Sequence, residues 1–219
     1  MRRTIARELM DDPVENLDEL AGNLRDIAFA NARFGGLAPV VRAVAALDAR
    51  TVLDVGCGAG DLALAIVRAR AGVRVTCLDV SEQMLDVARR TAAGHPAIDF
   101  VRADGGSLPF GDGAFDAVTC TLALHHFEPA AAGVLLRELR RVASRGPVVC
   151  DLRRSAVAFV ATWLWSRTSH NRLTRHDAPL SVRRAYTPRE ALMLARDGGW
   201  RAPAVRREPF FRMTLTDAA

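Results

Sequence analysis

The segment from Asp54 to Gly60 carries the residue types best suited to chemistry. It spells Asp-Val-Gly-Cys-Gly-Ala-Gly and lies between a short strand pattern and a helical pattern. Glycine lets a backbone turn tightly and approach a ligand that a Cβ would block. The N–H groups at the start of the following helix point toward such a ligand. The segment predicts a ligand-binding turn, and an ordinary tight turn is the plainer alternative.

The spacing of the glycines distinguishes between two classes of ligand. A dinucleotide site follows the pattern G-x-G-x-x-G, but the position three residues after Gly58 is Asp61. A carboxylate at the start of a helix would repel a pyrophosphate. The spacing here is instead G-x-G-x-G, with Asp54 two residues before Gly56.

Two further carboxylates follow the next two strand patterns. Asp79 ends the second strand pattern, about 20 residues after the glycine turn, where an acidic side chain can accept both hydroxyls of a ribose. Asp104 follows the third strand pattern. Each alone is equally explained as a cap or a turn residue. Together with the turn they lie at the carboxyl ends of successive strands, where open α/β sheets bind ligands.

His125 and His126 follow the fourth strand pattern. Histidine titrates near neutral pH and can act as a general base. The alternative is that the pair serves packing and loop geometry. The cysteines form no C-x-x-C pair and the His, Cys and Asp residues show no metal-ligand spacing, so the sequence predicts no metal.

The elements that must position these residues alternate between strand and helix patterns, which is typical of a parallel sheet covered on both faces. We therefore predict an α/β fold: a Rossmann-like, doubly wound, mostly parallel seven-stranded sheet. The strands are expected at Thr51–Val55, Val73–Asp79, Ile98–Arg102, Phe115–Thr121, Pro147–Leu152, Ala202–Arg206 and Phe210–Leu215. The main helices are expected at Asp61–Val67, from Ser81 to Arg90, at Ala131–Val142, and from Thr187 to Gly198.

Two regions flank this alternation. Residues 1–50 are expected to form an N-terminal helical extension or lid, with one helix opening at Asp11-Asp12-Pro13 and a second at about 39–47. The remaining residues, 51–219, are expected to form the main domain. Within it, 155–186 is expected to be a substrate lid after the fifth strand, apolar to Trp165 and then polar and irregular.

Composition bounds the class of protein. The chain has 219 residues, a net charge of +5 and 30 basic residues, all of them Arg. Nucleic-acid binding is one explanation; compositional bias is the plainer one, because the Arg residues are scattered rather than focused in one patch. There is no apolar run of about 20 residues and no secretory leader, so a cytoplasmic protein is expected. Three of the four cysteines lie in apolar strand patterns and are expected to be buried, reduced thiols.

The motifs together resemble those of class I S-adenosylmethionine-dependent methyltransferases. The resemblance covers about residues 50–152 and is closest to the small-molecule branch of ubiquinone and menaquinone methyltransferases, also called methyltransferase type 11. Segments 25–36 and 176–188 also look like bacterial methyltransferases associated with type III polyketide synthases.

The resemblance implies S-adenosylmethionine as cofactor and S-adenosylhomocysteine as product, with His125 or His126 as a base. It implies that the cofactor contacts are Arg33, Asp54, Gly56, Cys57, Gly58, Gly60, Asp79, Val80, Met84, Ala103, Asp104, Gly105 and Thr121. The acceptor contacts are expected among Phe34, Trp163, His170, His176, Arg183 and Tyr186. A solvated loop and core packing are the alternatives for these last positions.

The function expected is methyl transfer to a small molecule, by O- or C-methylation of a phenolic, quinone-like or polyketide-derived acceptor in secondary metabolism. The segment Thr121 to Leu124 lacks the Asn/Asp-Pro-Pro-aromatic motif of amino-methylating families, which disfavours nucleic acid as the partner. RNA methylation and a non-catalytic cofactor-binding partner remain as alternatives. A monomer or homodimer is expected, without stable membrane insertion but with transient lipid contact through the apolar lid.

Overall fold

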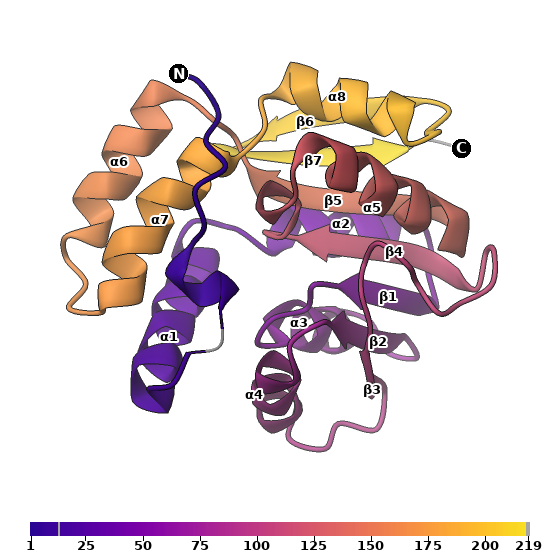
Figure 1. Ribbon diagram of the computed structural model, residues 1–219. Coiled ribbons are helices and arrows are strands. Elements are labelled where there is room, and N and C mark those ends of the chain that lie inside the picture. The colour runs from indigo at the N-terminus through magenta and orange to yellow at the C-terminus, as the bar shows by residue number, and fades with distance from the viewer. Residues whose placement is uncertain (13, 218–219) are drawn as a thin grey trace.

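The computed structural model describes residues 1–12 and 14–217, and one seven-stranded sheet organises them (Figure 1). The strand order is β3-β2-β1-β4-β5-β7-β6. Strands β1 to β5 pair in parallel, and β7 runs antiparallel to both β5 and β6. The α/β, Rossmann-like, mostly parallel fold class predicted from the sequence is confirmed.

The predicted strands are all present, with the largest change at the start of β5. The strands are β1 Thr51–Val55, β2 Arg74–Asp79, β3 Ile98–Arg102, β4 Phe115–Thr121, β5 Ala143–Leu152, β6 Pro203–Glu208 and β7 Arg212–Asp217. The helices are η1 Leu9–Asp11, α1 Leu17–Arg33, α2 Ala38–Ala46, α3 Asp61–Ala69, α4 Glu82–Ala92, η2 Leu124–His126, α5 Pro129–Val142, α6 Ala156–Ser166, α7 Arg172–Arg184 and α8 Pro188–Asp197.

The sheet buries an apolar layer on each face. On one face, Leu53 and Val118 pack with Leu135 and Leu139 of α5. On the other, side chains of α2, α3 and α4 cover the strands. Cys77, Cys120 and Cys150 are buried in strands and Cys57 in the glycine turn, and none forms a disulfide, as predicted for the strand cysteines.

The first long helix begins later than the sequence pattern predicts. Helix α1 starts at Leu17 because the Asn16 side chain accepts hydrogen bonds from the backbone N–H groups of Asp18 and Glu19 and so caps it. The predicted helix start at Asp11-Asp12-Pro13 is wrong for Asp11 and Asp12. Asp11 is the last residue of the short 3-10 helix η1, and Asp12 follows it. Pro13 lies outside the described residues.

The prediction of an irregular segment from Ser166 to Arg184 is also wrong. Residues Arg172–Arg184 form helix α7, whose N-cap Asn171 accepts from the Thr174 N–H group. An internal proline removes one helical hydrogen bond, but packing against α6 and α1 compensates, and Leu173 and Val182 are 1% exposed. Tertiary burial therefore overrides the polar composition that suggested a loop.

Helices α1, α6 and α7 stand together beyond the carboxyl ends of the parallel strands, and the chain before α1 passes between α7 and the sheet (Figure 1). This arrangement brings residues from both ends of the chain to the edge where the glycine turn lies. Within the described residues, no helix has both the length and the apolar character needed to span a bilayer.

Candidate functional site

The glycine turn after β1 has a conformation that suits glycine alone. Gly56, Gly58 and Gly60 have φ values of 69°, 52° and 79°. Gly60 is the N-cap of α3, and the N–H of Gly56 donates to the carbonyl oxygen of Leu78 at 2.8 Å. The left-handed region is unfavourable for residues with a Cβ. The turn therefore brings bare backbone to the carboxyl edge of the sheet, as the sequence predicts.

Asp79 ties the turn to the next strand. One oxygen of its carboxylate accepts from the Gly58 N–H at 3.0 Å, and the other accepts from the Ser81 N–H at 3.0 Å. Each carboxylate oxygen has two acceptor positions, so both retain capacity for a further donor. The side chain is thus held where a ribose diol above the turn could donate to it.

Asp54 lies beneath the turn. It is 2% exposed, and its carboxylate accepts from the Thr119 hydroxyl at 2.8 Å. Burial raises the pKa of Asp54 from 3.8 to about 7; the Thr119 hydrogen bond opposes the increase and the Asp79 charge adds to it. A cationic ligand above the turn would favour ionised Asp54.

Asp54→Asn is expected to change how stability depends on pH. Between pH 4 and 7 the unfolded wild-type chain has released this proton while the folded chain still binds it, so the free energy of unfolding falls as pH rises. Asparagine does not titrate, so the variant should gain stability relative to wild type, by up to about 4 kcal/mol, between pH 4 and 8. Urea unfolding at four pH values measures this. The exposed Asp99→Asn is the control, and a pH-independent difference for Asp54→Asn would contradict the burial argument.

Two alanine substitutions in the turn are expected to separate folding from binding. No described atom lies within 4 Å of a Cβ built on Gly58, whereas a Cβ on Gly56 would lie 2.9 Å from that of Ala123. Gly58→Ala should therefore cost only about 1–2 kcal/mol of stability, yet weaken cofactor binding at least about tenfold by filling the ligand's side of the turn. Gly56→Ala should lose more stability. Thermal unfolding and calorimetry with S-adenosylhomocysteine measure both effects, and full affinity in Gly58→Ala would contradict the prediction.

The segment after β3 forms a second wall of this edge. The N–H of Ala103 donates to the Asp79 carbonyl, and exposed Asp104 accepts from the Gly106 N–H at 2.8 Å. A Cβ on Gly105 would lie 3.0 Å from Leu135. Val80 is 64% exposed at this edge. Of the other predicted cofactor contacts, Met84 is buried beneath α1, Cys57 is buried in the turn, and Arg33 is exposed at the end of α1.

The end of β4 carries an unsatisfied polar atom. The hydroxyl of Thr121 is buried without a hydrogen-bond partner among the described residues. The next residue, Leu122, has a φ of 54°, a strained value for a residue with a Cβ. Buried donors without partners and strained backbone concentrate at functional sites, and a ligand above the turn would supply the missing partner of Thr121.

His125 follows in η2 and is 3% exposed. Its Nδ1 lies 2.7 Å from one carboxylate oxygen of Asp151, and its backbone N–H donates to the other at 2.9 Å. Burial alone would raise the pKa of Asp151, but His125 outweighs burial and the pKa is lowered. An ionised carboxylate only accepts, so Nδ1 of His125 carries a proton, and Nε2 is the ring nitrogen that does not face Asp151.

His126 repeats this arrangement with a different carboxylate. Its Nδ1 lies 2.7 Å from an oxygen of Asp11. Burial would raise the pKa of Asp11, but hydrogen bonds from His126 and Arg184 hold it below the ordinary value. The His126 side chain is 27% exposed and lines a cavity of about 340 Å³ together with Arg3, Ile5, Arg7, Asp11, Glu128 and Arg184. The structure thus brings together the two predicted bases but exposes only His126.

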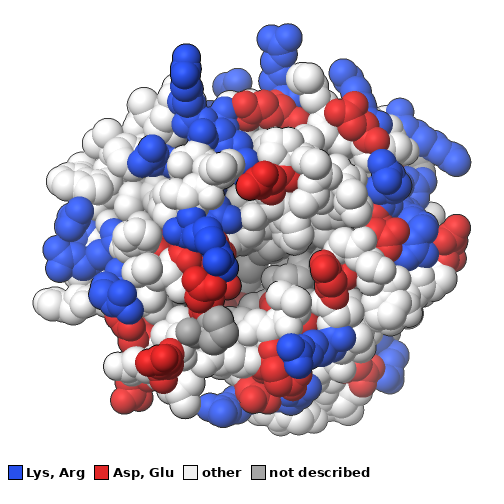
Figure 2. Space-filling model, viewed as in Figure 1, with Lys and Arg blue, Asp and Glu red and all other residues white. Residues whose placement is uncertain are grey.

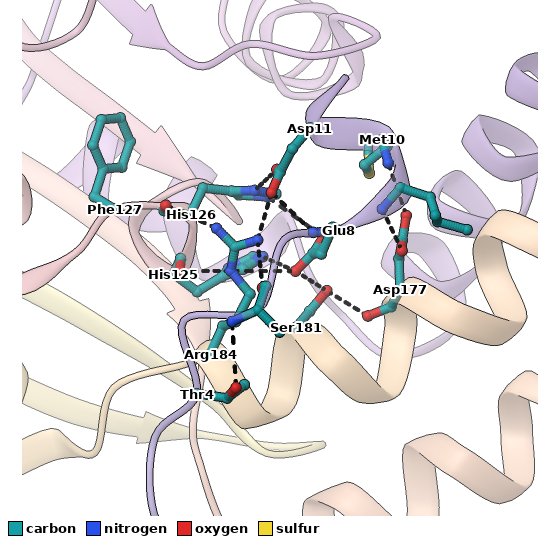
Figure 3. A network of polar contacts seen from close by, with 12 residues as sticks. Thr4, Glu8, Met10, Asp11, His125, His126, Phe127, Asp177, Ser181 and Arg184 are labelled. Atoms are coloured by element: carbon teal, nitrogen blue, oxygen red, sulfur yellow. Dashed lines mark hydrogen bonds and ion pairs between the residues drawn. The ribbon is translucent and has the colours of Figure 1, made fainter. Parts of the chain in front are cut away.

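Glu8 faces both imidazole rings (Figure 3). Its carboxylate oxygens lie 3.8 Å from Nε2 of His125 and 3.9 Å from Nε2 of His126. These three residues are a possible set of metal ligands, with ligand atoms within 4.8 Å of one another. Tetrahedral zinc needs ligand atoms about 3.4 Å apart, and the Arg184 guanidinium lies 3.8 Å from the carboxylate. The spacing therefore fits an ion-pair network better than a cation, and the predicted absence of metal stays a prediction.

The predicted acceptor residues are distributed over α1, α6 and α7. Phe34 contacts Trp165 and Phe210, with ring centroids 6.3 and 5.1 Å apart. Trp163 is 40% exposed beneath Arg167. Tyr186 is buried, and its hydroxyl donates to the Phe127 carbonyl. The remaining three are exposed on or next to α7: His170, His176 and Arg183.

Sequence patterns missed four residues of this site. Glu8, Asp11, Asp151 and Arg184 surround the histidine pair and come from four separate elements or segments. Phe210, which packs against Phe34, was likewise not among the predicted site residues. The local signal for Asp11 is the acidic run before Pro13, and that run predicts the start of a helix rather than a partner for a histidine.

The surface on this side is hollowed near its centre (Figure 2). Arginine side chains are spread around this face, with acidic side chains beside many of them, rather than gathered in a continuous stripe. This distribution agrees with the prediction that the Arg residues are scattered rather than focused in one patch, and it does not favour a nucleic-acid-binding surface on this face.

The comparisons with known proteins agree with this geometry. Residues 52–146 match the family model described as "Methyltransferase domain". Demethylmenaquinone methyltransferase of Clavibacter sepedonicus is 39% identical over 121 residues, which cover 54% of this chain and 48% of that protein. The chain spans about half the length of the curated relatives it matches.

Two solved structures share the fold. The S-adenosylmethionine-dependent methyltransferase SibL superposes with a TM-score of 0.69 at 20% identity, covering 100% of this chain and 62% of SibL. The structure described as PigF with SAH superposes with a TM-score of 0.61 at 19% identity, covering 78% of this chain and 51% of PigF. The glycine turn and strands β2 to β4 lie within the part of the chain, residues 52–146, that matches the methyltransferase domain model. The curated relatives that this chain resembles are named demethylmenaquinone methyltransferase, in agreement with the resemblance that the sequence motifs indicate.

Proposed function

We propose that this protein transfers a methyl group from S-adenosylmethionine to a small-molecule acceptor. The observation that carries the proposal is the left-handed glycine turn joined to the Asp79 carboxylate, inside the matched methyltransferase domain. Asp79 would hold the ribose, exposed Val80 and Asp104 the adenine, and Thr121 a polar atom of the methionine part. The orphaned Thr121 hydroxyl and the spare acceptor capacity of Asp79 fit this ligand.

When bound, S-adenosylmethionine supplies an already activated methyl group. The chain's own residues then need to align the acceptor and remove its proton. We assign the second role to Nε2 of His126, because its Nδ1 is held by Asp11 and its ring borders a cavity. His125 is too deeply buried for this contact and instead holds the β4 end against Asp151.

The acceptor proposed is a phenolic, quinone-like or polyketide-derived compound, methylated at oxygen or carbon. The curated relatives named demethylmenaquinone methyltransferase support a quinone-like ring. The aromatic group of Phe34, Trp165 and Phe210 supports a planar, apolar ligand. The lid role of 155–186 and of the N-terminal extension 1–50 belongs to this proposal, as do a cytoplasmic location and transient lipid contact through α6.

Calorimetry with S-adenosylmethionine and S-adenosylhomocysteine tests the cofactor part. Incubation with methyl-labelled cofactor and cell extracts, followed by mass spectrometry, then tests for an acceptor. A folded protein that binds neither form of the cofactor would overturn the proposed function. Uptake of the cofactor without any labelled small molecule would favour a non-catalytic binding partner instead.

A further inference from the structure

Arg212 is a buried cation with which no carboxylate of the described residues forms an ion pair. It begins β7 at the carboxyl edge of the sheet and is 5% exposed. Its Nη2 donates to the side-chain oxygen of Asn31 at 2.9 Å, but its Nη1 is buried without a hydrogen-bond partner in the described part of the chain. Burial lowers the pKa of Arg212, yet a guanidinium stays protonated at neutral pH. A buried charge without a counter-charge is strongly unfavourable.

Two carboxylates neighbour Arg212 in the sheet, and both are engaged elsewhere. Glu208, its cross-strand neighbour on β6, accepts from the Arg206 side chain at 2.7 Å. Asp151 lies one residue before the cross-strand neighbour of Arg212 on β5, so it faces the opposite side of the sheet, where His125 holds it. Across residues 1–12 and 14–217, no carboxylate oxygen lies within 4.0 Å of the Arg212 guanidinium. The guanidinium can therefore pair with an anion that the chain does not supply.

Two aromatic rings occupy the same corner of the molecule. Phe210 comes two residues before Arg212, and its ring lies 5.1 Å from that of Phe34. Phe34 leads into the link between α1 and α2, where a Cβ built on Gly36 would lie 2.8 Å from Nη1 of Arg212. Phe210 is 53% exposed and has a φ of 53°, and strained backbone of this kind concentrates at functional sites. A planar ring with a negative oxygen matches two aromatic rings beside an unpaired guanidinium.

The position of Arg212 in the sheet separates it from the proposed cofactor contacts. Strand β7 is two strands away from β4, which carries Thr121 at its end. Neighbouring strands lie about 4.8 Å apart, so these two strand ends are separated by roughly 10 Å. A substituted ring can fill that span. The guanidinium is therefore placed for the acceptor rather than for the methionine part of the cofactor.

We propose that Arg212 binds an anionic oxygen of the methyl acceptor, which makes the acceptor a planar compound with an ionised hydroxyl or carboxylate group. The inference rests on the proposed methyl transfer and adds the charge of the acceptor to it. Asn31 orients the guanidinium through Nη2 and leaves Nη1 for the ligand. The link through Gly35 and Gly36 covers Nη1 and shifts when the acceptor oxygen takes its place beside it. The contact is a charge-assisted hydrogen bond, without a covalent step.

The test compares two probes, naphthoate and naphthamide, which share a ring and a shape and differ by one charge. Calorimetry at neutral pH measures their dissociation constants for the full chain saturated with S-adenosylhomocysteine. The wild-type protein is expected to bind naphthoate at least about tenfold more tightly than naphthamide, because a hydrogen bond to a charged group contributes that much. In Arg212→Gln the preference should disappear, so that the two dissociation constants become about equal.

Asn31→Asp provides a second test that leaves Arg212 in place. The new carboxylate would occupy the position of the amide oxygen that Nη2 already contacts at 2.9 Å, so the chain itself would supply the anion. The variant should unfold at a higher temperature than the wild-type protein at neutral pH, and its preference for naphthoate should disappear. Because aspartate has nearly the volume of asparagine, this variant decides the question even if Arg212→Gln folds poorly.

Two control measurements separate the acceptor from the cofactor and from net charge. Arg207→Gln removes an exposed cation from β6 and should leave the preference for naphthoate unchanged. Arg212→Gln should keep the wild-type affinity for S-adenosylhomocysteine. A fall in that affinity of about tenfold or more would assign Arg212 to the carboxylate of the cofactor and would overturn the acceptor assignment.

A wild-type protein that binds naphthoate no more tightly than naphthamide would overturn the inference. An unchanged preference in folded Arg212→Gln or in Asn31→Asp would overturn it as well. The proposed function survives these results if the same samples bind S-adenosylhomocysteine. Conversely, a protein that binds no cofactor but shows a preference dependent on Arg212 would refute methyl transfer and leave the anion site established.

Discussion

Asp79→Ala is expected to raise the dissociation constant for S-adenosylhomocysteine at least about a hundredfold. The substitution removes the acceptor for the predicted ribose hydroxyls, and a hydrogen bond to a charged group contributes about 1.5–3 kcal/mol. It also releases the Gly58 and Ser81 N–H groups, so the glycine turn loses its tie to β2. Isothermal calorimetry measures the loss directly.

Asp99→Asn provides the matched control for Asp79. Asp99 is exposed on the adjacent strand β3 and pairs with Arg74. Both residues lie near the amino ends of their strands, whereas the glycine turn lies at the carboxyl ends. The affinity of the Asp99→Asn variant for S-adenosylhomocysteine should equal that of the wild-type protein. If a folded Asp79→Ala protein kept full affinity for S-adenosylhomocysteine, the assignment of Asp79 as a cofactor-binding residue would be contradicted.

His126→Asn is expected to lower the turnover number by about 10² to 10⁴, the usual contribution of a general base. Cofactor affinity should stay unchanged, because His126 lies past the end of β4 and faces Asp11 and Glu8. The measurement is methyl transfer to the acceptor found by labelling, at saturating cofactor and across pH 5–9. His95→Asn, which alters an imidazole outside the site, serves as control.

His125→Asn should behave differently from His126→Asn. His125 is buried, and its ring and backbone together satisfy both oxygens of Asp151. Loss of the ring leaves a buried carboxylate poorly paired, at a cost of about 1–3 kcal/mol of stability.

Near-full turnover of the His126→Asn variant at every pH would contradict the assignment of His126 as the base.

The sheet and the cofactor side were predictable because their signals are local. Alternating strand and helix patterns identify the parallel sheet, and its strands place Asp54, the glycines and Asp79 at a common edge. Turn conformation is specified by the glycines themselves. Each of these inferences needs only a few consecutive residues and the rule that parallel strands end at the same edge.

The surroundings of the histidines were not predictable in this way. Asp11 and Arg184 are 173 positions apart in the chain and meet only after folding. Glu8 and Asp11 lie in a segment without regular periodicity. The sequence of α7 is mostly polar and does not indicate a helix that buries Thr174 and Asp177. Pairings of this kind depend on where α7 docks, which no local pattern specifies.

The uncovered apolar side of α6 bears on how unfolding of this protein should be followed. Val157, Val160 and Leu164 are more than half exposed, so a dye that fluoresces on apolar surfaces should already bind the native state. Trp163 and Trp165 on the same helix would respond to that dye or to detergent. Trp200 is the better native reporter, because it is 4% exposed and its indole N–H donates to the Leu136 carbonyl at 2.8 Å inside the sheet's α5 layer.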